Sequence, residues 1–358
     1  MKKRAMLDVK KHISRGNLKM KKLVALGLAA SLGLMLTACG STGSNGGAAS
    51  AGDDAAGGSY TLKVGTALTE TDPLYLALSD VFEKTVEEKT NGDVQVELYS
   101  GSQLGSDEDV LEQAIVGAGV GVITDPGRLS NYVYDFGVLQ APYIASDYEE
   151  VLKLFETDTY NSLCDELKNQ GFNVLSFNYF QGERELFTKN PVAKPEDLKG
   201  QRIRSSGSKV VTSTLEAMGA NTTVLPWSES YQALQQQVIE GVEVHLSAAV
   251  GSSMQEVTKY LAFTGHQQLL TGLVISDAWF QSLPAEYQTI LQEASYEAGK
   301  TASENVLAKN DEYLKTLTDA GVEVIDCDVE AFKAACDKAY EELGYTEIKA
   351  QIDAELGR

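Results

Sequence analysis

Segments with strand-like and helix-like patterns alternate along most of this chain, and this alternation constrains the fold more than any other feature. Apolar and polar residues alternate at 62–64, and apolar residues then recur at helical spacing from 77 to 86. Between them, Asp72-Pro73 supplies a helix N-cap and a first-turn proline. Asn91-Gly92 ends this helix, and strand-like alternation returns at 94–98. Alternating strands and helices predict an α/β fold with a largely parallel sheet.

The pattern continues through the next hundred residues. A helix is expected at 107–117 and a short buried strand at 120–123. Ser146-x-x-Glu149 is a capping-box sequence, which predicts one helix that ends at Gly171. A strand is expected at 174–177. The second half shows the same alternation of strand and helix patterns. A helix is expected to end at Met218, and strands are expected at 185–188, 201–204, 222–225 and 242–246.

A long helical stretch is expected from Pro284 to about Ala320, with Gly299 as its weak point. A helix of ~35 residues is ~52 Å long, whereas a small domain is ~30 Å across. It must therefore bend or lie across two lobes. Gly321 ends it, and a strand at 322–325 and two helices complete the chain.

Two lobes are expected because about 300 residues are too many for one modest core. We expect residues 60–181 with about 270–309 to form lobe I, and 182–269 with about 310–358 to form lobe II.

The first 38 residues have the features of a signal peptide. Lys21-Lys22 precedes an apolar run of 14 residues, from Leu23 to Leu36, which is too short to span a bilayer comfortably. The following Leu36-Thr37-Ala38-Cys39 resembles a bacterial lipobox, which implies cleavage before Cys39 and lipidation of its thiol. The alternative is an ordinary signal peptide that happens to contain a cysteine. Met20 is an alternative start, with residues 1–19 an over-extended reading frame.

A glycine-rich tether follows the lipobox. Residues 40–59 contain seven Gly and no large apolar side chain, so we expect a flexible linker with a reach of roughly 25 Å. No other segment is apolar enough to span a bilayer, so the chain cannot itself be a permease. These features place the protein outside the cytoplasm, at the outer face of the membrane or in the periplasm.

Composition excludes several classes of function. The chain has 30 Lys+Arg against 51 Asp+Glu, and nine of the basic residues lie in the first 38 positions. The remainder is strongly acidic, which argues against nucleic acid and anionic membrane surfaces as partners. Three scattered histidines and no Cys-x-x-Cys motif predict no zinc site. No catalytic or nucleotide-binding motif is present, and we expect no cofactor. Cys327 and Cys336 could form a disulfide or remain free thiols.

Four segments carry a family resemblance. They are VEEKTNGDVQVELYSGSQLGSDEDVLEQ (86–113), PEDLKGQRIR (195–204), LPWSESYQALQQQVIEG (225–241) and QEVTKYLAFTGH (255–266). In this order, behind a lipobox, they resemble the solute-binding proteins of TRAP transporters, the DctP-type extracytoplasmic receptors. The resemblance covers nearly everything from Leu62 to about Ala298. It implies a two-lobed periplasmic-binding-protein-like fold that closes by hinge bending on a small organic anion.

The resemblance also implies which residue holds the ligand. An arginine at the end of the family's Pro-x-Asp-Leu-Lys-Gly segment grips the ligand carboxylate, and Arg204 stands at that position. A guanidinium presents a planar fork that matches a carboxylate bidentately and remains charged. The alternative is a solvated arginine at a strand end.

Five further positions are implied as ligand contacts. Arg184 falls where the family often has a second ligand-facing arginine, and Asp125 and Arg128 lie in a first-lobe loop that supplies polar contacts. Glu70 follows the first strand, where the family can contact the far end of the ligand. Trp227 can stack on the ligand or wall the site. The alternatives are a core aromatic for Trp227 and a surface pair for Asp125 and Arg128.

One departure leaves the ligand class open. The family's usual Asp-Gly-Gln-Glu-Asn-Pro run reads Glu240-Gly241-Val242-Glu243-Val244-His245 here. Val244 replaces the asparagine that commonly assists the carboxylate grip, so either Arg204 works with less help or His245 or another side chain substitutes.

The expected function is that of a monomeric, lipid-anchored receptor and not of an enzyme. It would capture a C4-dicarboxylate, another carboxylate or a sugar acid, and deliver it to the small and large membrane subunits of a TRAP permease. One alternative is a receptor of an ABC transporter or of a signalling protein. A second is a secreted carbohydrate-active or ester-cleaving enzyme.

Overall fold

A computed structural model describes residues 60–358 of the chain. The expected signal peptide (1–38), the lipidated Cys39 and the linker up to residue 59 lie outside the described residues. Within residues 60–358, no helix combines the length and the apolarity that crossing a membrane requires.

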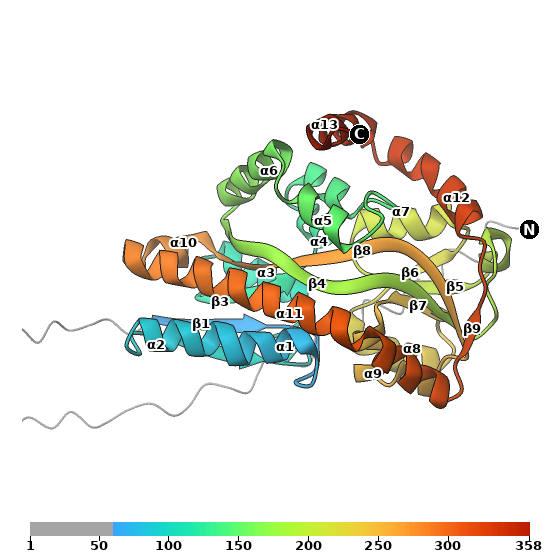
Figure 1. Cartoon of the computed structure of the whole chain (residues 1–358), viewed down its shortest axis with the longest axis horizontal. Coiled ribbons are helices and arrows are strands. Elements are labelled where there is room, and N and C mark those ends of the chain that lie inside the picture. Colours follow the sequence, from blue (N-terminus) through green and yellow to red (C-terminus); the bar gives the residue numbers. More distant parts are fainter. Residues whose placement is uncertain (1–59) are drawn as a thin grey trace, which may run out of the picture. The chain divides into compact units, whose positions relative to one another are not determined.

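The described residues form an α/β structure around one mixed sheet, as Figure 1 shows. The strand order is β2-β1-β3-β8-β4-β7-β5-β6, and β9 pairs with β8. The strands are β1 (Tyr60–Gly65), β2 (Val94–Tyr99), β3 (Val120–Thr124), β4 (Phe172–Thr188), β5 (Arg202–Ser205), β6 (Asn221–Val224), β7 (Gly241–Val244), β8 (Tyr260–Ser276) and β9 (Glu323–Ile325).

The sheet is parallel at its two ends and antiparallel in its middle. Strand β1 is parallel to β2 and β3, and β5 is parallel to β6 and β7. Strands β4 and β8 are antiparallel to each other and to the end strands that they join, β7 and β3. The prediction of a largely parallel sheet therefore holds for each end and is wrong for the centre.

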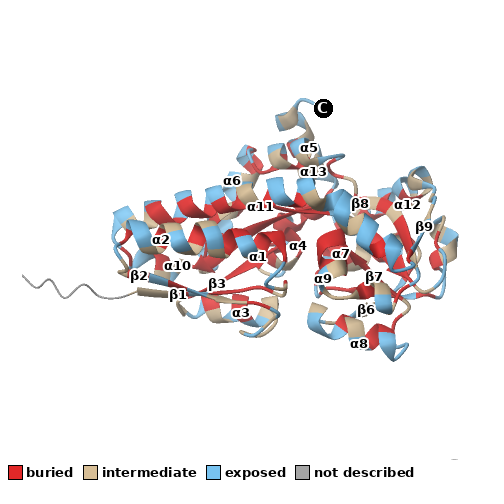
Figure 2. Ribbon diagram, turned by 60° about the horizontal axis from the view of Figure 1, so that its bottom comes forward, coloured by how far each residue is buried: buried red, intermediate tan, exposed pale blue. Residues whose placement is uncertain are grey.

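Helices cover the sheet and bury its apolar side chains, as Figure 2 shows by the concentration of buried residues on the strands. The α-helices are α1 (Pro73–Ala77), α2 (Lys84–Lys89), α3 (Asp107–Ile115), α4 (Pro126–Leu129), α5 (Tyr148–Leu154), α6 (Asp158–Asn169), α7 (Lys209–Ala217), α8 (Ser230–Gln235), α9 (Leu246–Gly251), α10 (Asp277–Gln281), α11 (Ala285–Asp319), α12 (Val329–Glu342) and α13 (Thr346–Leu356). A π-helical segment, η1 (Leu78–Glu83), joins α1 to α2, and the 3₁₀ segments are η2 (Tyr134–Gln140), η3 (Pro195–Leu198), η4 (Trp227–Glu229) and η5 (Met254–Glu256).

Strands β4 and β8 are 17 residues each and run through both ends of the sheet. Their pairing has register shifts between Val174 and Ser176, between Phe180 and Gly182 and at two other points. These irregularities interrupt the polar–apolar alternation, which explains why the sequence predicted only the fragments 174–177 and 185–188 and missed β8. The expected lobe boundaries near 181 and 269 fall inside these two strands.

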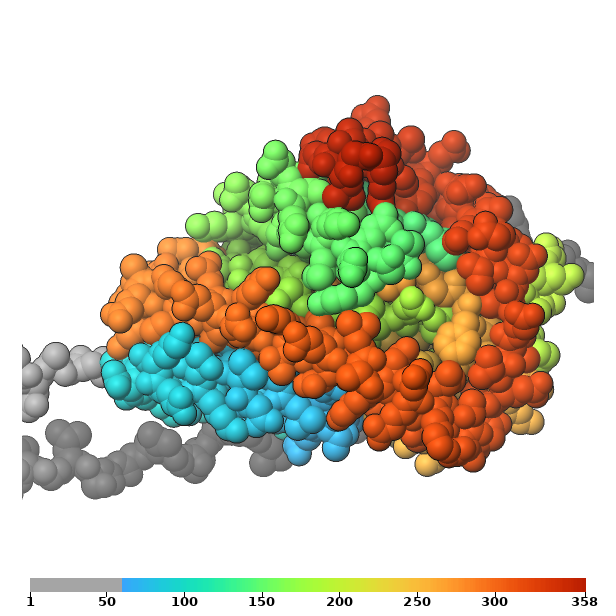
Figure 3. Space-filling view, in the orientation of Figure 1, coloured from blue at the N-terminus to red at the C-terminus, as the bar shows by residue number. Residues whose placement is uncertain are grey.

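The long helix α11 has 35 residues and confirms the prediction of a helix that spans both lobes. It packs against α1, η1 and α2 near the first end of the sheet and against α9 near the other. Figure 3 shows the side chains of α11 lying against the blue helices. Ser303 of α11 accepts from the backbone N–H of Phe180 and donates to the carbonyl of Asn178, so the helix is fastened to the middle of β4.

The single helix expected from 146 to 171 is two helices, α5 and α6. The N-cap of α5 is Asp147, whose carboxylate accepts from the N–H of Glu150, and the predicted Ser146–Glu149 box is not formed. Thr157 caps α6 through its hydroxyl, which accepts from the N–H of Tyr160, and a second helix starts there. By contrast, the predicted Asp72 cap is present, with Oδ1 accepting from the N–H of Leu74 at 2.9 Å.

The C-terminal helices bridge distant parts of the chain. Helix α12 packs on α7 and β8, whereas α13 packs on α5, α6 and η2, which the expected division assigns to the other lobe. The division by residue number stays a prediction. Cys327 and Cys336 are both free thiols, as is Cys164, so the unpaired alternative is the one observed.

We predict that Gly299→Ala destabilises the protein although alanine favours helix by about 1 kcal/mol over glycine. A Cβ at this position would collide with the side-chain amide of Asn178, which donates to the carbonyl of Tyr296 at 2.8 Å. Such overpacking costs about 1–3 kcal/mol. Urea denaturation should show a lower free energy of unfolding, and in an Asn178→Ala background the same change should become stabilising. Equal effects in both backgrounds would contradict the predicted contact.

Candidate functional site

A partly open cavity of about 60 Å³ lies where several strands of both ends of the sheet stop. Thr66 follows β1, Asp125 follows β3, Ser206 follows β5 and His245 follows β7, so parallel strands present the residues after their carboxyl ends. The middles of β4 and β8 supply Gln181, Arg184, Leu269 and Thr271.

Arg204 is the one arginine of the cavity lining that has no carboxylate within salt-bridge distance among the described residues. It lies on β5 and is only 2% exposed. Its Nε donates to the carbonyl of Leu225 at 2.9 Å, and its buried Nη2 has no hydrogen-bond partner in the described structure. Burial lowers the pKa of Arg204 to about 10, and the positive charge of Arg128 adds to the effect. The site thus holds a desolvated cation with unused donors, which is costly without an anion.

Arg184 enters the cavity from β4, and its charge is already neutralised. Its Nε and Nη2 contact the carboxylate of Glu243, and Nη2 also donates to the Glu243 carbonyl at 2.8 Å. Glu243 is fully buried on β7, the strand paired with β4. Burial alone would raise the pKa of Glu243, but Arg184 and His266 hold it at about 2.

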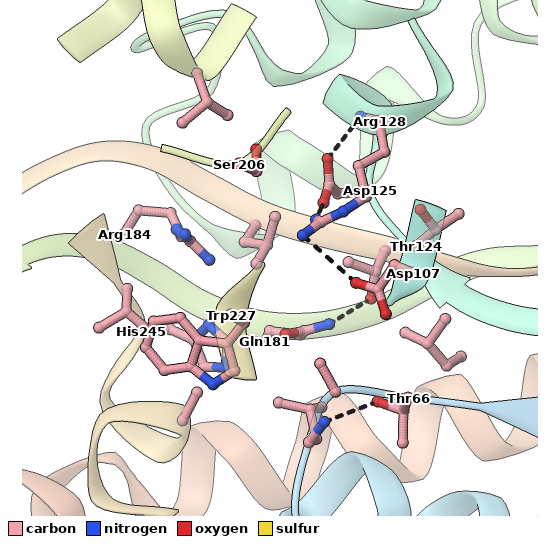
Figure 4. A pocket seen from close by; sticks show the side chains of 18 of the residues that line it. Thr66, Asp107, Thr124, Asp125, Arg128, Gln181, Arg184, Ser206, Trp227 and His245 are labelled. Atoms are coloured by element: carbon pink, nitrogen blue, oxygen red, sulfur yellow. Dashed lines mark hydrogen bonds and ion pairs between the residues drawn. The ribbon is translucent and has the colours of Figure 1, made fainter. Parts of the chain in front are cut away.

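Arg128 is held by three carboxylates on the other side of the cavity. Its Nε lies 2.8 Å from Glu108 Oε1, its Nη2 lies 3.5 Å from Asp107 Oδ2, and its Nη1 contacts Asp125, as Figure 4 shows for Asp125 and Asp107. Asp125 also caps α4 by accepting from the backbone N–H of Arg128 at 2.9 Å. Burial raises the pKa of Asp107 to about 6, although Arg128 opposes the shift.

His245 and Trp227 form the wall beside Arg184, as Figure 4 shows. His245 is 2% exposed, and neither of its ring nitrogens has a partner in the described structure. Burial and the charge of Arg184 lower the pKa of His245 to about 3, so the imidazole is neutral and offers one donor and one acceptor. The indole of Trp227 lies 5.6 Å below the Arg204 guanidinium and donates from Nε1 to Ser252 at 3.0 Å. Val244 lines the cavity next to His245 with an apolar surface.

The structure brings six of the seven residues suggested from the sequence into this one cavity. They are Arg204, Arg184, Asp125, Arg128, Trp227 and His245. Glu70 is exposed on the segment after β1, where its carboxylate accepts from Ser100 at 3.3 Å, and it does not line the cavity. Its contact with the far end of a ligand stays a prediction.

Several polar residues of the lining were not found from the sequence. Asp107 lies in the LGSDEDV stretch but was interpreted only as part of a helix. Thr66, Thr124 and Ser206 could have been found from their positions at or just after strand ends. Gln140 and Gln181 carry no such signal, because the 3₁₀ segment η2 and a register-shifted strand position them.

A family model decides what kind of protein has this cavity. Residues 64–347 match DctP, described as bacterial extracellular solute-binding protein, family 7. The chain belongs to this family. The expectation of a solute-binding protein of the TRAP type, with a two-lobed periplasmic-binding-protein-like fold, is confirmed at that level.

Relatives and solved structures agree with the match. The C4-dicarboxylate-binding periplasmic protein DctP of Rhodobacter capsulatus is 32% identical over 241 residues, which cover 67% of this chain and 72% of the relative. A TRAP periplasmic solute-binding protein of Ochrobacterium anthropi with bound L-fuconate is 34% identical, covers 83% of this chain and 99% of its own, and has a TM-score of 0.80. A counterpart from Actinobacillus succinogenes with bound L-galactonate is 32% identical, covers 82% and 99%, and has a TM-score of 0.78.

We predict that His245 contributes to acid destabilisation of this DctP-family protein. The folded state holds the pKa of His245 at about 3, below its usual 6.5, so the unfolded chain binds a proton first as the pH falls. The associated stability is present above pH 6.5 and is lost toward pH 3, with a loss of ~2 kcal/mol at pH 5. Urea denaturation at pH 7.5 and pH 5 should therefore show a smaller acid loss for His245→Asn than for the wild type. An unchanged acid loss would contradict a buried neutral imidazole.

Proposed function

We propose that this protein captures a small carboxylate outside the membrane and passes it to the membrane subunits of a TRAP permease. The observation that carries the proposal is the buried Arg204 guanidinium, which has no carboxylate partner and an unused donor in a partly open cavity. The relatives named above bind a C4-dicarboxylate, L-fuconate and L-galactonate, and each of these ligands carries a carboxylate.

The physical reasoning rests on charge balance. A ligand carboxylate would neutralise the one cavity arginine that the described protein leaves unpaired, and the planar fork allows two parallel hydrogen bonds. Each hydrogen bond to a charged group contributes about 1.5–3 kcal/mol when water is excluded. The Trp227 ring and the Leu225 carbonyl already fix the guanidinium, so binding orders little of it.

The other cavity residues have supporting roles in this proposal. Arg184 and Arg128 are held in place by ion pairs with Glu243 and Asp125. These side chains therefore form fixed polar parts of the cavity wall. His245 replaces the hydrogen-bonding capacity that Val244 lacks, because both of its ring nitrogens are unused. Closure of the two lobes about β4 and β8 would seal the ligand from water.

The remaining parts of the proposal concern location and chemistry. The predicted signal peptide and Cys39 would tether the protein by lipid to the outer face of the membrane, and it would act as a monomer. It would bind and release its ligand without chemical change, as no step in capture needs a covalent intermediate.

We predict that Arg204→Met abolishes ligand-induced stabilisation while the apo protein stays folded and gains stability. Removal of an unpaired buried charge relieves its desolvation cost, and buried ion-to-apolar replacements stabilise by about 1–4 kcal/mol in favourable cases. A thermal-shift screen of sodium salts of mono- and dicarboxylates would first identify ligands of the wild type, and calorimetry would then compare the variant.

Arg202→Met is the matched control for this experiment. Arg202 lies on the same strand, is half-exposed and pairs with Glu240 outside the cavity, so its loss should leave the ligand response intact. Wild-type affinity in Arg204→Met would show that the carboxylate is held elsewhere.

We predict that Cys39→Ser releases the protein from the membrane. Cell fractionation and mass spectrometry of the N-terminal peptide should find the wild type in the membrane fraction with lipid on Cys39, and the variant in the soluble fraction without it. A soluble, unlipidated wild type would identify the ordinary signal peptide instead.

A further inference from the structure

The charges around the cavity are unevenly matched. Three arginines line it, and four carboxylates lie on or directly behind its walls: Asp107, Glu108, Asp125 and Glu243. Every one of these carboxylates is already in contact with Arg128 or Arg184. Arg204 alone is left for a ligand, so the protein supplies one free positive charge for one acid group.

The end of the cavity near Arg128 is unfavourable for a second acid group. Asp107 and Asp125 themselves line the cavity there, and they share Arg128 with Glu108. A carboxylate placed beside them would meet like charge in a partly desolvated site, where such juxtaposition is repulsive. The raised pKa of Asp107 indicates that burial already opposes one more negative charge at this end.

The same residues suit hydroxyl groups. An ionised aspartate is an acceptor only, so Asp107 and Asp125 can each accept a hydrogen bond that a ligand hydroxyl donates. The rest of the lining is rich in neutral polar groups, including Thr66, Thr124, Gln140, Gln181, Ser206 and Thr271. Thr124 is 2% exposed, and its buried hydroxyl has no hydrogen-bond partner in the described structure. Neutral His245 adds a free donor and a free acceptor.

We propose that the ligand is a hydroxylated monocarboxylate, with its acid on Arg204 and its hydroxyl-bearing tail toward Asp107, which rejects ligands that carry a second acid. This inference rests on the proposed function and narrows it. Asp107 is then the residue that separates acids with one carboxylate from those with two. Unpaired polar groups and like charges discriminate more strongly than apolar contacts do.

Pairs of acids that differ only at one end test this selectivity. Gluconate and glucarate share a six-carbon hydroxylated chain, and threonate and tartrate share a four-carbon one; in each pair the terminal CH₂OH of the first is a carboxylate in the second. Calorimetry on the mature protein should find an aldonate of four to six carbons that binds about tenfold or more tightly than its dicarboxylate partner. Butyrate and hexanoate, which lack hydroxyls, should bind more weakly than the aldonate of the same length.

The variant Asp107→Asn tests the residue. It removes one negative charge and keeps the size of the side chain, so the dicarboxylate should bind more tightly and the difference within each pair should shrink to about threefold. Glu112→Gln is the matched control, because Glu112 is exposed on the same helix and does not line the cavity. It should leave both affinities unchanged.

Two results would overturn the inference: a dicarboxylate that binds the wild type as tightly as its aldonate partner, or no binding by any aldonate. An unaltered preference in Asp107→Asn would remove Asp107 from its role. The variant Arg204→Met distinguishes a failure of the proposed selectivity from a failure of the proposed function. If dicarboxylates bind the wild type more tightly than aldonates do, but do not bind Arg204→Met, only the proposed selectivity is wrong. If ligands still bind Arg204→Met, the proposed contact between Arg204 and the carboxylate is wrong.

Discussion

The unpaired guanidinium of Arg204 is the feature on which the rest of the site depends. A cation that is 2% exposed and without a carboxylate neighbour lowers the stability of the empty protein. The neighbouring arginines show that this fold can neutralise such a charge, since Glu243 does so for Arg184 and three carboxylates do so for Arg128. An unpaired buried charge lowers the stability of the empty protein and favours the binding of an anion. Unsatisfied groups at functional sites often have this effect.

The topology of the sheet explains how residues from distant parts of the chain meet around that cation. Each end of the sheet is a small parallel unit, and the carboxyl ends of its strands deliver the residues that follow them to the cavity. The long antiparallel strands β4 and β8 join the two units and add Gln181 and Arg184 from their middles. The site is therefore assembled by three kinds of position: strand ends of one unit, strand ends of the other, and the strands between them.

Much of the fold could be predicted from the sequence because local signals were strong. The Asp72-Pro73 cap, the alternation in β1 and β2 and the uninterrupted helical stretch after Pro284 all agree with the structure. The register shifts in β4 hid its length, and a break at Thr157 divided a helix that looked continuous. Asp107 escaped notice as a site residue because its proximity to Arg128 depends on how α3 docks beside β3, which no local pattern encodes.

The continuity of β4 and β8 has a consequence for folding. Strand β3 pairs with β1 on one side and with β8 on the other, so the first unit cannot complete its sheet until residues 260–276 have been synthesised. One cluster of buried apolar residues also includes Leu62 and Val64 of one unit together with Val242 and Val244 of the other. Contacts between such remote residues raise the contact order, which slows folding. The two long strands that join the units thus also make the folding of each unit depend on the other.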